Sequence, residues 1–301
     1  MSRETIHEEV TGRIIALLER GTPPWRRTWT TTSGTTSSIP SNAITRRPYQ
    51  GVNRIILWAA ALAGCYPTHD WATYRQIQQV GGQVRKGERG TRVVLYRPIE
   101  ASDRRRPGDT QEEDRNHRGK RTIWIMRGFT VFNIAQCDGL AQAPAPAAPP
   151  RDAIPGAERF VRHVGARILH GGDRAFYVPD ADVIYLPPSE SFTSPAAYYA
   201  TSLHEHVHWT GHAERLNRLD KWAHFGSEAY ACEELVAELG AAFLCADLEV
   251  RGELEHHASY LGHWLKVLRR DSKALFAAAA DANRAAEHMK ALQPAQIEQA
   301  A

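Results

Sequence analysis

The hydrophobic positions of the chain fall into two groups of elements, separated by a stretch with almost nothing to bury. In the first group, apolar residues recur at helical spacing over residues 4–20 and again over 51–62. Residues 71–80 predict a further short helix, and the apolar runs 91–96 and 123–134 predict strands. We therefore expect the first group to form an α+β domain.

The separating stretch, residues 142–155, is rich in Ala and Pro, which predicts an extended linker. It divides the chain into an N-terminal domain of residues 1–141 and a C-terminal domain of residues 156–301. In the second domain, helical patterns cover residues 157–169, 195–211, 228–250, 252–270 and 271–292. Two short strands are predicted within 175–186, around Pro179 and Asp180. The whole chain is thus expected to be α+β, with a mainly helical second domain that holds a small sheet.

The helix predicted over 195–211 contains the pattern HExxH, formed by His204, Glu205 and His208. Residues four apart lie on one face of a helix, so both imidazoles can bind the same ion. Zn²⁺ suits this site best, and Mn²⁺ is the other divalent ion to consider. Glu205 lies beside the pair and can take a proton from a water whose pKa the ion lowers. The pattern therefore predicts a zinc-dependent hydrolase of the metallopeptidase type.

A catalytic zinc ion also needs a third protein ligand. Glu214 stands where the extended pattern HExxHxxGxxH has its third ligand, although a carboxylate departs from that pattern. Glu234, on a later predicted helix, is the preferred candidate because the arrangement resembles the thermolysin-like group. That resemblance implies that Glu234 binds the metal and that Glu238 supports a ligand histidine. Tyr230 lies one turn before Glu234 on the same helix face, so its hydroxyl is predicted to reach a bound carbonyl oxygen.

Other features narrow the class of protein. The chain has no apolar run of about 18 residues and no secretory signal pattern, so we expect a cytoplasmic protein without a membrane partner. Its four cysteines lack CxxC spacing and are expected to be reduced thiols. The mixed charge run 103–121 is expected to be a solvated hairpin tip or disordered. Of the remaining histidines, only His224 is kept as a candidate oxyanion donor.

Positive charge is concentrated in the first domain. Residues 1–140 hold 22 of the 37 Lys and Arg residues but only 13 of the 34 Asp and Glu residues. The sequence Trp25-Arg26-Arg27-Thr28-Trp29 interleaves aromatic rings with guanidinium groups, which is the chemistry of single-stranded DNA binding. Further candidates for DNA contact in this domain are Tyr49, Arg54, Arg85, Lys86, Arg89 and Arg92. Trp58, Trp71 and Trp124 are instead assigned to the core.

Several blocks of sequence carry a family resemblance. In the first domain they are residues 24–29, 40–53, 71–76, 81–91 and 131–140, and in the second 176–177, 182–187, the HExxH helix with 209–212, and 215–218. Together these blocks resemble the ArdC-type antirestriction proteins of conjugative plasmids. Two features depart from the family pattern: Arg27-Thr28 stands where the family often has Lys-Pro, and the charged run 103–121 is an insertion.

The resemblance implies an N-terminal domain that binds single-stranded DNA and a C-terminal zincin-like metallopeptidase domain. Such a protein protects incoming plasmid DNA from host restriction, and its protein substrate would be a host restriction enzyme or another protein. One alternative is a non-catalytic protein that covers DNA or blocks the restriction enzyme, with a structural or vestigial metal site. A third hypothesis is a regulatory protease whose N-terminal domain only docks a partner.

Overall fold

The computed structural model describes residues 5–25, 39–98, 110–115, 121–140, 153–219, 228–250 and 258–294. The chain divides into two compact units. Unit 1 consists of Met1–Ile39, Gln50–Val52 and Pro144–Ala301, and unit 2 of Pro40–Tyr49 and Asn53–Ala143. The N-terminal segment therefore packs with the C-terminal half of the chain. The sequence instead predicts that this segment belongs to an N-terminal domain of residues 1–141.

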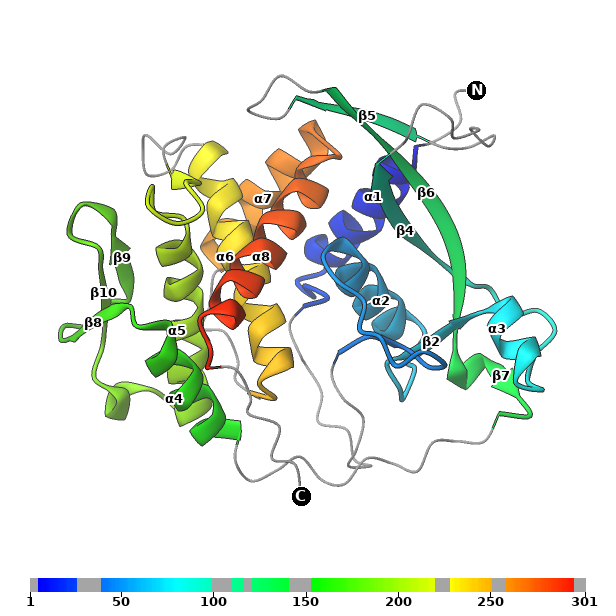
Figure 1. The fold of residues 1–301 in the computed structure, drawn as a ribbon, viewed down its shortest axis with the longest axis horizontal. Helices are drawn as coiled ribbons and strands as arrows, with labels where there is room; N and C mark the ends of the chain where they lie inside the picture. Colours follow the sequence, from blue (N-terminus) through cyan, green and yellow to red (C-terminus); the bar gives the residue numbers. More distant parts are fainter. Residues whose placement is uncertain are drawn as a thin grey trace. The chain divides into compact units, whose positions relative to one another are not determined.

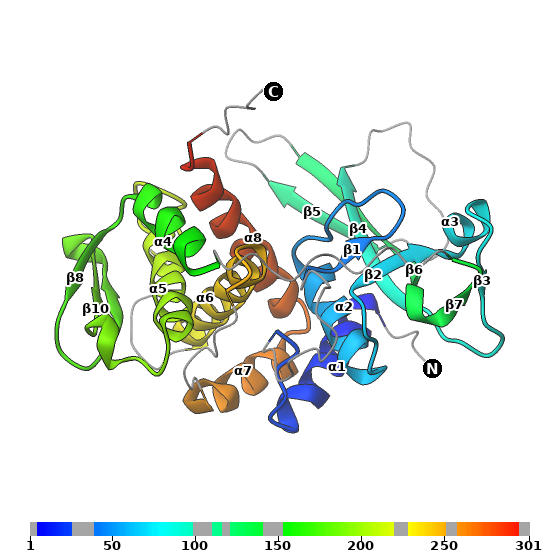
Figure 2. The ribbon, with the colours of Figure 1, turned by 90° about the horizontal axis from the view of Figure 1, so that it is seen from below.

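Helix α6 (Glu228–Asp247) is the centre of unit 1. Nearly all of its side chains from Ala231 onward are buried, and it packs against α5 (Pro195–Thr210) and α8 (Ala274–Ala291), as both ribbon views show (Figures 1 and 2). Gly240 permits the close approach of α6 to α5, because a Cβ there would lie 2.7 Å from a methyl carbon of Val207. This close contact places residues of the HExxH helix directly beside α6.

The N-terminal helix α1 (Ile6–Glu19) packs against α7 (Ala258–Arg270) within unit 1. Thr5 begins α1 with a capping box shared with Glu8, which satisfies free N–H groups at the helix start. Its buried face includes Ile6, Ile14 and Leu18. The Thr11 hydroxyl donates a hydrogen bond to the backbone oxygen of Ser272 at 2.7 Å, next to the start of α8. Helix α1 is thus part of the core of unit 1.

A three-stranded sheet lies beside α5, with the strand order β8-β10-β9. Its strands are β8 (Arg167–His170), β9 (Phe176–Val178) and β10 (Val183–Leu186), and β9 is an edge strand. The two strands predicted within 175–186 are present. The helix predicted over 157–169 is wrong at its end, because α4 (Ala153–Val164) stops before Gly165, whose φ of 76° starts the turn into β8.

Unit 2 contains a five-stranded sheet in the order β1-β2-β6-β4, with β5 also paired to β6. Its strands are β1 (Ser41–Asn42), β2 (Asp70–Thr73), β4 (Thr91–Pro98), β5 (Thr110–Arg115) and β6 (Arg121–Asn133). β3 (Gln83–Val84) and β7 (Cys137–Asp138) form a separate pair. Helix α2 is Val52–Ala63. The helix predicted over 71–80 is correct only in its second half, since α3 (Tyr74–Gln79) follows β2.

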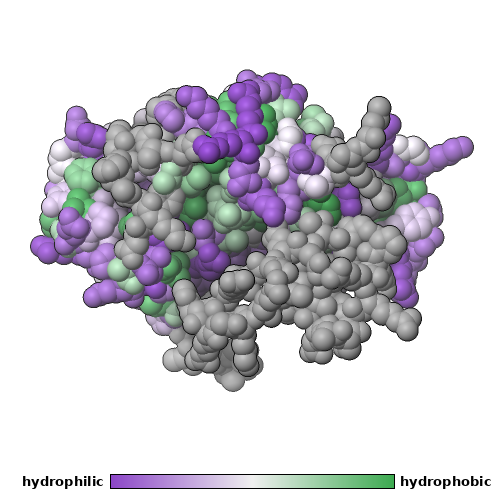
Figure 3. Space-filling model, turned by 90° about the horizontal axis from the view of Figure 1, so that it is seen from above, coloured by the Kyte–Doolittle hydropathy of each residue, from purple (hydrophilic) through white to green (hydrophobic). Residues whose placement is uncertain are grey.

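On the face drawn in Figure 3, the coloured residues are a mixture, with hydrophilic and hydrophobic residues interspersed. None of the helices in the described ranges is long and apolar enough to cross a membrane. All four cysteines are free thiols.

Candidate metal centre

Three side chains from α5 and α6 converge where the two helices touch. Nε2 of His204 lies 3.5 Å from one carboxylate oxygen of Glu234, and Nε2 of His208 lies 3.6 Å from the other. Two ligand atoms on a tetrahedral zinc with bonds of about 2.0–2.1 Å stand about 3.3–3.4 Å apart. One atom from each of the three residues falls within 4.8 Å of the others. The donor set and its spacing therefore fit one divalent ion.

His208 is held by a partner that the sequence did not indicate. Its Nδ1 lies 3.1 Å from Oε1 of Glu233, and Glu233 accepts two hydrogen bonds of 2.7 Å from the guanidinium of Arg218. Arg218 also donates to the backbone oxygen of Val207. Glu233 and Arg218 are both buried, so each charge has its counter-charge. This pair fixes the imidazole so that Nε2 points at the metal position.

The electrostatics of the ligands follow from these contacts. Burial alone would lower the pKa of His208, but the hydrogen bond to Glu233 and the carboxylates of Glu234 and Glu205 raise it to about 9. Burial would raise the pKa of Glu234, while the hydrogen bond to His204 and the charges of both histidines lower it to about 2. Without an ion, a proton on His208 therefore balances the carboxylate of Glu234. A metal ion has to displace that proton, because it binds neutral imidazole.

Glu205 is buried next to the three ligands. Its carboxylate accepts a hydrogen bond from the backbone N–H of Tyr177 in β9, and burial raises its pKa. The turn after β9 is fixed by Arg215, which donates to both carboxylate oxygens of Asp182. The Tyr177 hydroxyl also donates to Asp182, at 2.7 Å. The loop after the HExxH helix thus positions the edge strand that contacts Glu205.

The two residues predicted to assist the site lie on α6 as expected, with partners that alter their interpretation. Tyr230 donates a hydrogen bond to the carboxylate of Glu234, which contributes to the low pKa of that group. Glu238 is fully buried and accepts a hydrogen bond from Nε1 of Trp25 at 3.3 Å. Glu233 contacts the ligand histidine His208, and support of His204 by Glu238 stays a prediction.

The remaining candidates lie outside the cluster. Glu214 is exposed in the loop after α5, and its side chain takes no part in the three-residue group. His206 is buried and faces its own helix, where Nδ1 lies 2.6 Å from the backbone oxygen of Ser202. His224 lies outside the described residues.

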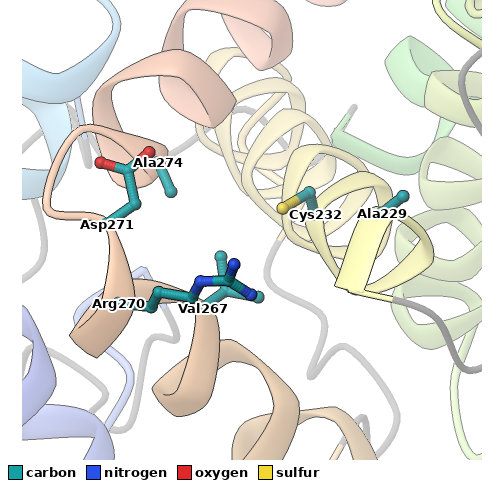
Figure 4. A pocket seen from close by; sticks show the side chains of 6 residues that line it. All are labelled: Ala229, Cys232, Val267, Arg270, Asp271 and Ala274. Atoms are coloured by element: carbon teal, nitrogen blue, oxygen red, sulfur yellow. The ribbon is translucent and has the colours of Figure 1, made fainter.

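A pocket of about 340 Å³ opens elsewhere in unit 1. Figure 4 shows Cys232 and Ala229 of α6 on one side of it and Arg270 and Asp271, at the end of α7, on the other. None of the residues that line it belongs to the metal cluster. The pocket is therefore separate from the metal centre.

The structure also changes the set of candidate DNA contacts. Trp25 is 6% exposed and packs edge-to-face against Trp264, with ring centroids 6.2 Å apart, so the prediction that it stacks on a base is wrong. Arg54 is 4% exposed and donates to the backbone oxygen of Tyr49, so it is not available to a phosphate. Arg26, Arg27 and Trp29 lie outside the described residues.

The other candidates belong to unit 2 and differ in exposure. Tyr49 is half-buried, and burial raises its pKa. Arg85 forms ion pairs with Glu88 and Asp138. Lys86 and Arg89 are exposed.

The two halves of the chain match two different protein families. Residues 4–132 match the family described as the N-terminal domain of anti-restriction factor ArdC, and residues 155–281 match the zincin-like metallopeptidase family. The crystal structure of the antirestriction ArdC protein from plasmid R388, in its metal-free form, is 37% identical, with a TM-score of 0.75 over 95% of this chain and 97% of that one. This chain belongs to the ArdC family of antirestriction proteins.

Two further relatives differ in how much of their length this chain covers. Protein y4eC of Sinorhizobium fredii (strain NBRC 101917 / NGR234) is 42% identical over 291 residues, which are 96% of this chain and 92% of that protein. DNA primase TraC of Escherichia coli is 37% identical over 303 residues, which are 99% of this chain but only 20% of the primase. The R388 ArdC protein has also been solved with Mn(II) bound, and that structure has a TM-score of 0.74 and 36% identity over 96% of this chain and 98% of that one.

Proposed function

We propose that this chain is an antirestriction protein that binds single-stranded DNA and carries a zinc-dependent metallopeptidase-type site in unit 1. The observation that supports the site most strongly is the convergence of His204, His208 and Glu234, with Glu205 beside them. Mn²⁺ is the alternative ion, because an ArdC relative has been solved with Mn(II). The protein would act in the cytoplasm on a restriction enzyme or another protein.

The residues around the site define what each would do in peptide hydrolysis. Zinc, when bound, would polarise the peptide carbonyl and lower the pKa of water. Glu205 would take one proton from the attacking water and return it to the leaving amide nitrogen, and burial, which raises its pKa, makes it a better proton acceptor. The N–H of Tyr177 holds this carboxylate in place.

Two arrangements support a catalytic rather than a purely structural site. A structural zinc is commonly closed by four protein ligands, whereas a catalytic zinc has three and leaves a position for water. Among the described residues, His204, His208 and Glu234 form a group of three. The Tyr230 hydroxyl is close enough to Glu234 to bond it, and could turn from there to a substrate carbonyl.

The substitution Glu205→Gln tests the catalytic part of the proposal. It keeps the shape of the side chain and all three metal ligands but removes the base. We expect the variant to bind about one equivalent of metal, as measured by elemental analysis, and to lose protection of DNA in a restriction assay in cells. Glu214→Gln, an exposed glutamate after the same helix, is the matched control and should keep both properties.

Full protection by Glu205→Gln with metal bound would instead favour the non-catalytic alternative, in which the protein covers DNA or blocks the restriction enzyme. Loss of metal in Glu214→Gln would show that the third ligand is Glu214. Absence of DNA binding by a wild-type protein that still protects would leave the hypothesis of a protease that docks a partner through its N-terminal half.

A further inference from the structure

We propose that single-stranded DNA crosses an exposed patch on one face of the sheet in unit 2, beside α3, with bases stacked on Tyr74 and Phe132 and phosphates held by Arg92 and its neighbouring cations. This inference rests on the proposed DNA binding and specifies its location. It replaces Trp25, whose ring is buried, with aromatic residues that the sequence analysis did not select.

The strand register places these side chains together. Phe132 of β6 is paired with Ala72 of β2, and Thr130 of β6 is paired with Arg92 of β4. Cross-strand partners, and residues two apart on a strand, point to the same face. Tyr74 is the first residue of α3, directly after β2, and its ring contacts that of Phe132, with centroids 6.4 Å apart. The strand residues and Tyr74 of α3 therefore form one surface.

The opposite face of the same strands is core around Trp71 and Val131. There, Trp71 and Asn133 are paired and fully buried, and Val131 is 1% exposed beside Thr91. On the proposed face, in contrast, Tyr74 is 42% exposed and Thr130 is also exposed. Ala72, on the same face, is fully buried and packs with Ile77 of α3, and Phe132 packs against them. The part of this face that is open to a ligand is therefore the patch around Tyr74 and Thr130.

Two glycines leave space beside Phe132 and Arg92 on this face. A Cβ at Gly90 would overlap the methyl group of Thr130 and lie 3.0 Å from Cζ of Phe132. A Cβ at Gly128 would collide with the guanidinium of Arg92, which lies across that glycine. Because no side chain rises at either position, a flat base can approach both the ring of Phe132 and the planar guanidinium. Bases stack favourably on both kinds of group.

The charge around this face suits a polyanion. Arg75, Lys86 and Arg89 are exposed and form no ion pair among the described residues. The nearby carboxylates are already engaged, since Glu88 and Asp138 both pair with Arg85. Free cations around stacking rings are the combination that binds a single strand, whose bases are available, better than a duplex, whose bases are already stacked.

The test uses the full-length protein and fluorescence anisotropy with a labelled oligothymidine, at several salt concentrations. Tyr74→Ala should weaken binding by roughly 5- to 150-fold, while Tyr74→Phe, which keeps the ring, should bind like wild type. Arg92→Ala should lower the slope of log affinity against log salt by about 0.7, the value for one phosphate contact on a single strand. A thermal melt of each variant confirms that it is folded.

Phe129→Ala is the matched control. Phe129 is 41% exposed on the same strand as Phe132, but it is paired with Val93, on the opposite side of the pleat. The Phe129→Ala variant should bind oligothymidine like wild type.

If Tyr74→Ala binds as tightly as wild type, or if Phe129→Ala loses as much affinity as Tyr74→Ala, the proposed face is wrong while DNA binding by the protein stands. If wild type itself ignores oligothymidine at low salt, the DNA part of the proposed function fails, and the face fails with it. Equal or tighter binding of oligouridine would assign the face to RNA.

Discussion

The metal centre of unit 1 and the open sheet face of unit 2 are built on opposite principles. At the metal centre each buried charge has a defined partner, as in the chain from His208 through Glu233 to Arg218. On the sheet face the cations Lys86 and Arg89 are exposed and unpaired among the described residues. The first arrangement fixes the orientation of the ligand His208, and the second supplies positive charge and a flat surface without fixed pairing. Single substitutions should therefore have large effects on metal binding at the metal centre, whereas substitution of a single cation on the sheet face should have a small, salt-dependent effect on DNA affinity.

The largest effect is expected for His208→Ala. Removing one of the three protein ligands should cost more than the about 10- to 100-fold in affinity that loss of an outer partner costs. Bound zinc, measured by elemental analysis, should fall from about one equivalent to near zero, while affinity for single-stranded DNA is unchanged. His263→Ala, an exposed histidine on α7, is the control and should keep its metal. Equal metal content in the two variants would exclude the site.

Trp25→Ala distinguishes a role of Trp25 in the core of unit 1 from a role in DNA binding. The ring is buried against Trp264 and bonded to Glu238, so its loss should lower the free energy of unfolding by about 3–5 kcal/mol, as for other buried aromatic residues. Urea denaturation measures this change. DNA affinity of the folded variant should stay at the wild-type value. A variant as stable as wild type that has lost DNA affinity would restore the stacking role.

Glu233→Gln is expected to have an intermediate effect. It weakens the acceptor for Nδ1 of His208 and leaves Arg218 without its counter-charge, so metal affinity should fall by about 10- to 100-fold. Competition with a chromophoric chelator measures the affinity, and a melting curve separates loss of metal from loss of fold. An equal fall in Glu238→Gln and none in Glu233→Gln would return the supporting role to Glu238.

These cases show what the sequence could and could not predict. The HExxH spacing follows from helix periodicity and Glu234 was preferred from the resemblance to the thermolysin-like group, and the structure brings those residues together. Periodicity cannot tell which acidic residue of α6 faces a histidine, because that depends on how α6 is rotated against α5. The burial of Trp25 depends on a contact with Glu238, 213 residues away, that no local pattern carries.

The fold shows the same limit. The strands around Pro179 were predictable from alternation and turn residues, and the packing of α1 on α7 was not, since contiguity along the chain favoured the other unit. Strand β8 was missed, although Gly165, a residue suited to a left-handed turn, was a usable signal. Arg218, which binds Glu233, lies in a loop, where no periodic pattern indicates which way a side chain points.

The smallest effect is predicted for two adjacent cations that sequence reasoning treated alike, Arg85 and Lys86. The Arg85 guanidinium donates to Glu88 at 3.0 Å and to the backbone oxygen of Ala135 at 2.5 Å, so it is occupied within the fold. Lys86 is exposed and has no ion pair in the described part of unit 2.

Lys86→Ala should therefore reduce the salt slope of binding to a single strand by about 0.7 and leave the melting temperature unchanged. Arg85→Ala should lower the melting temperature, because it removes the contacts of Arg85 with Asp138 in β7 and with Ala135. It should leave the salt slope unchanged. Anisotropy titrations at four salt concentrations resolve the two variants. A salt slope that falls equally in both variants would mean that exposure and pairing do not decide which cations contact the phosphates. The distinction between paired and unpaired charges, on which the comparison of the two regions rests, would then be wrong for unit 2.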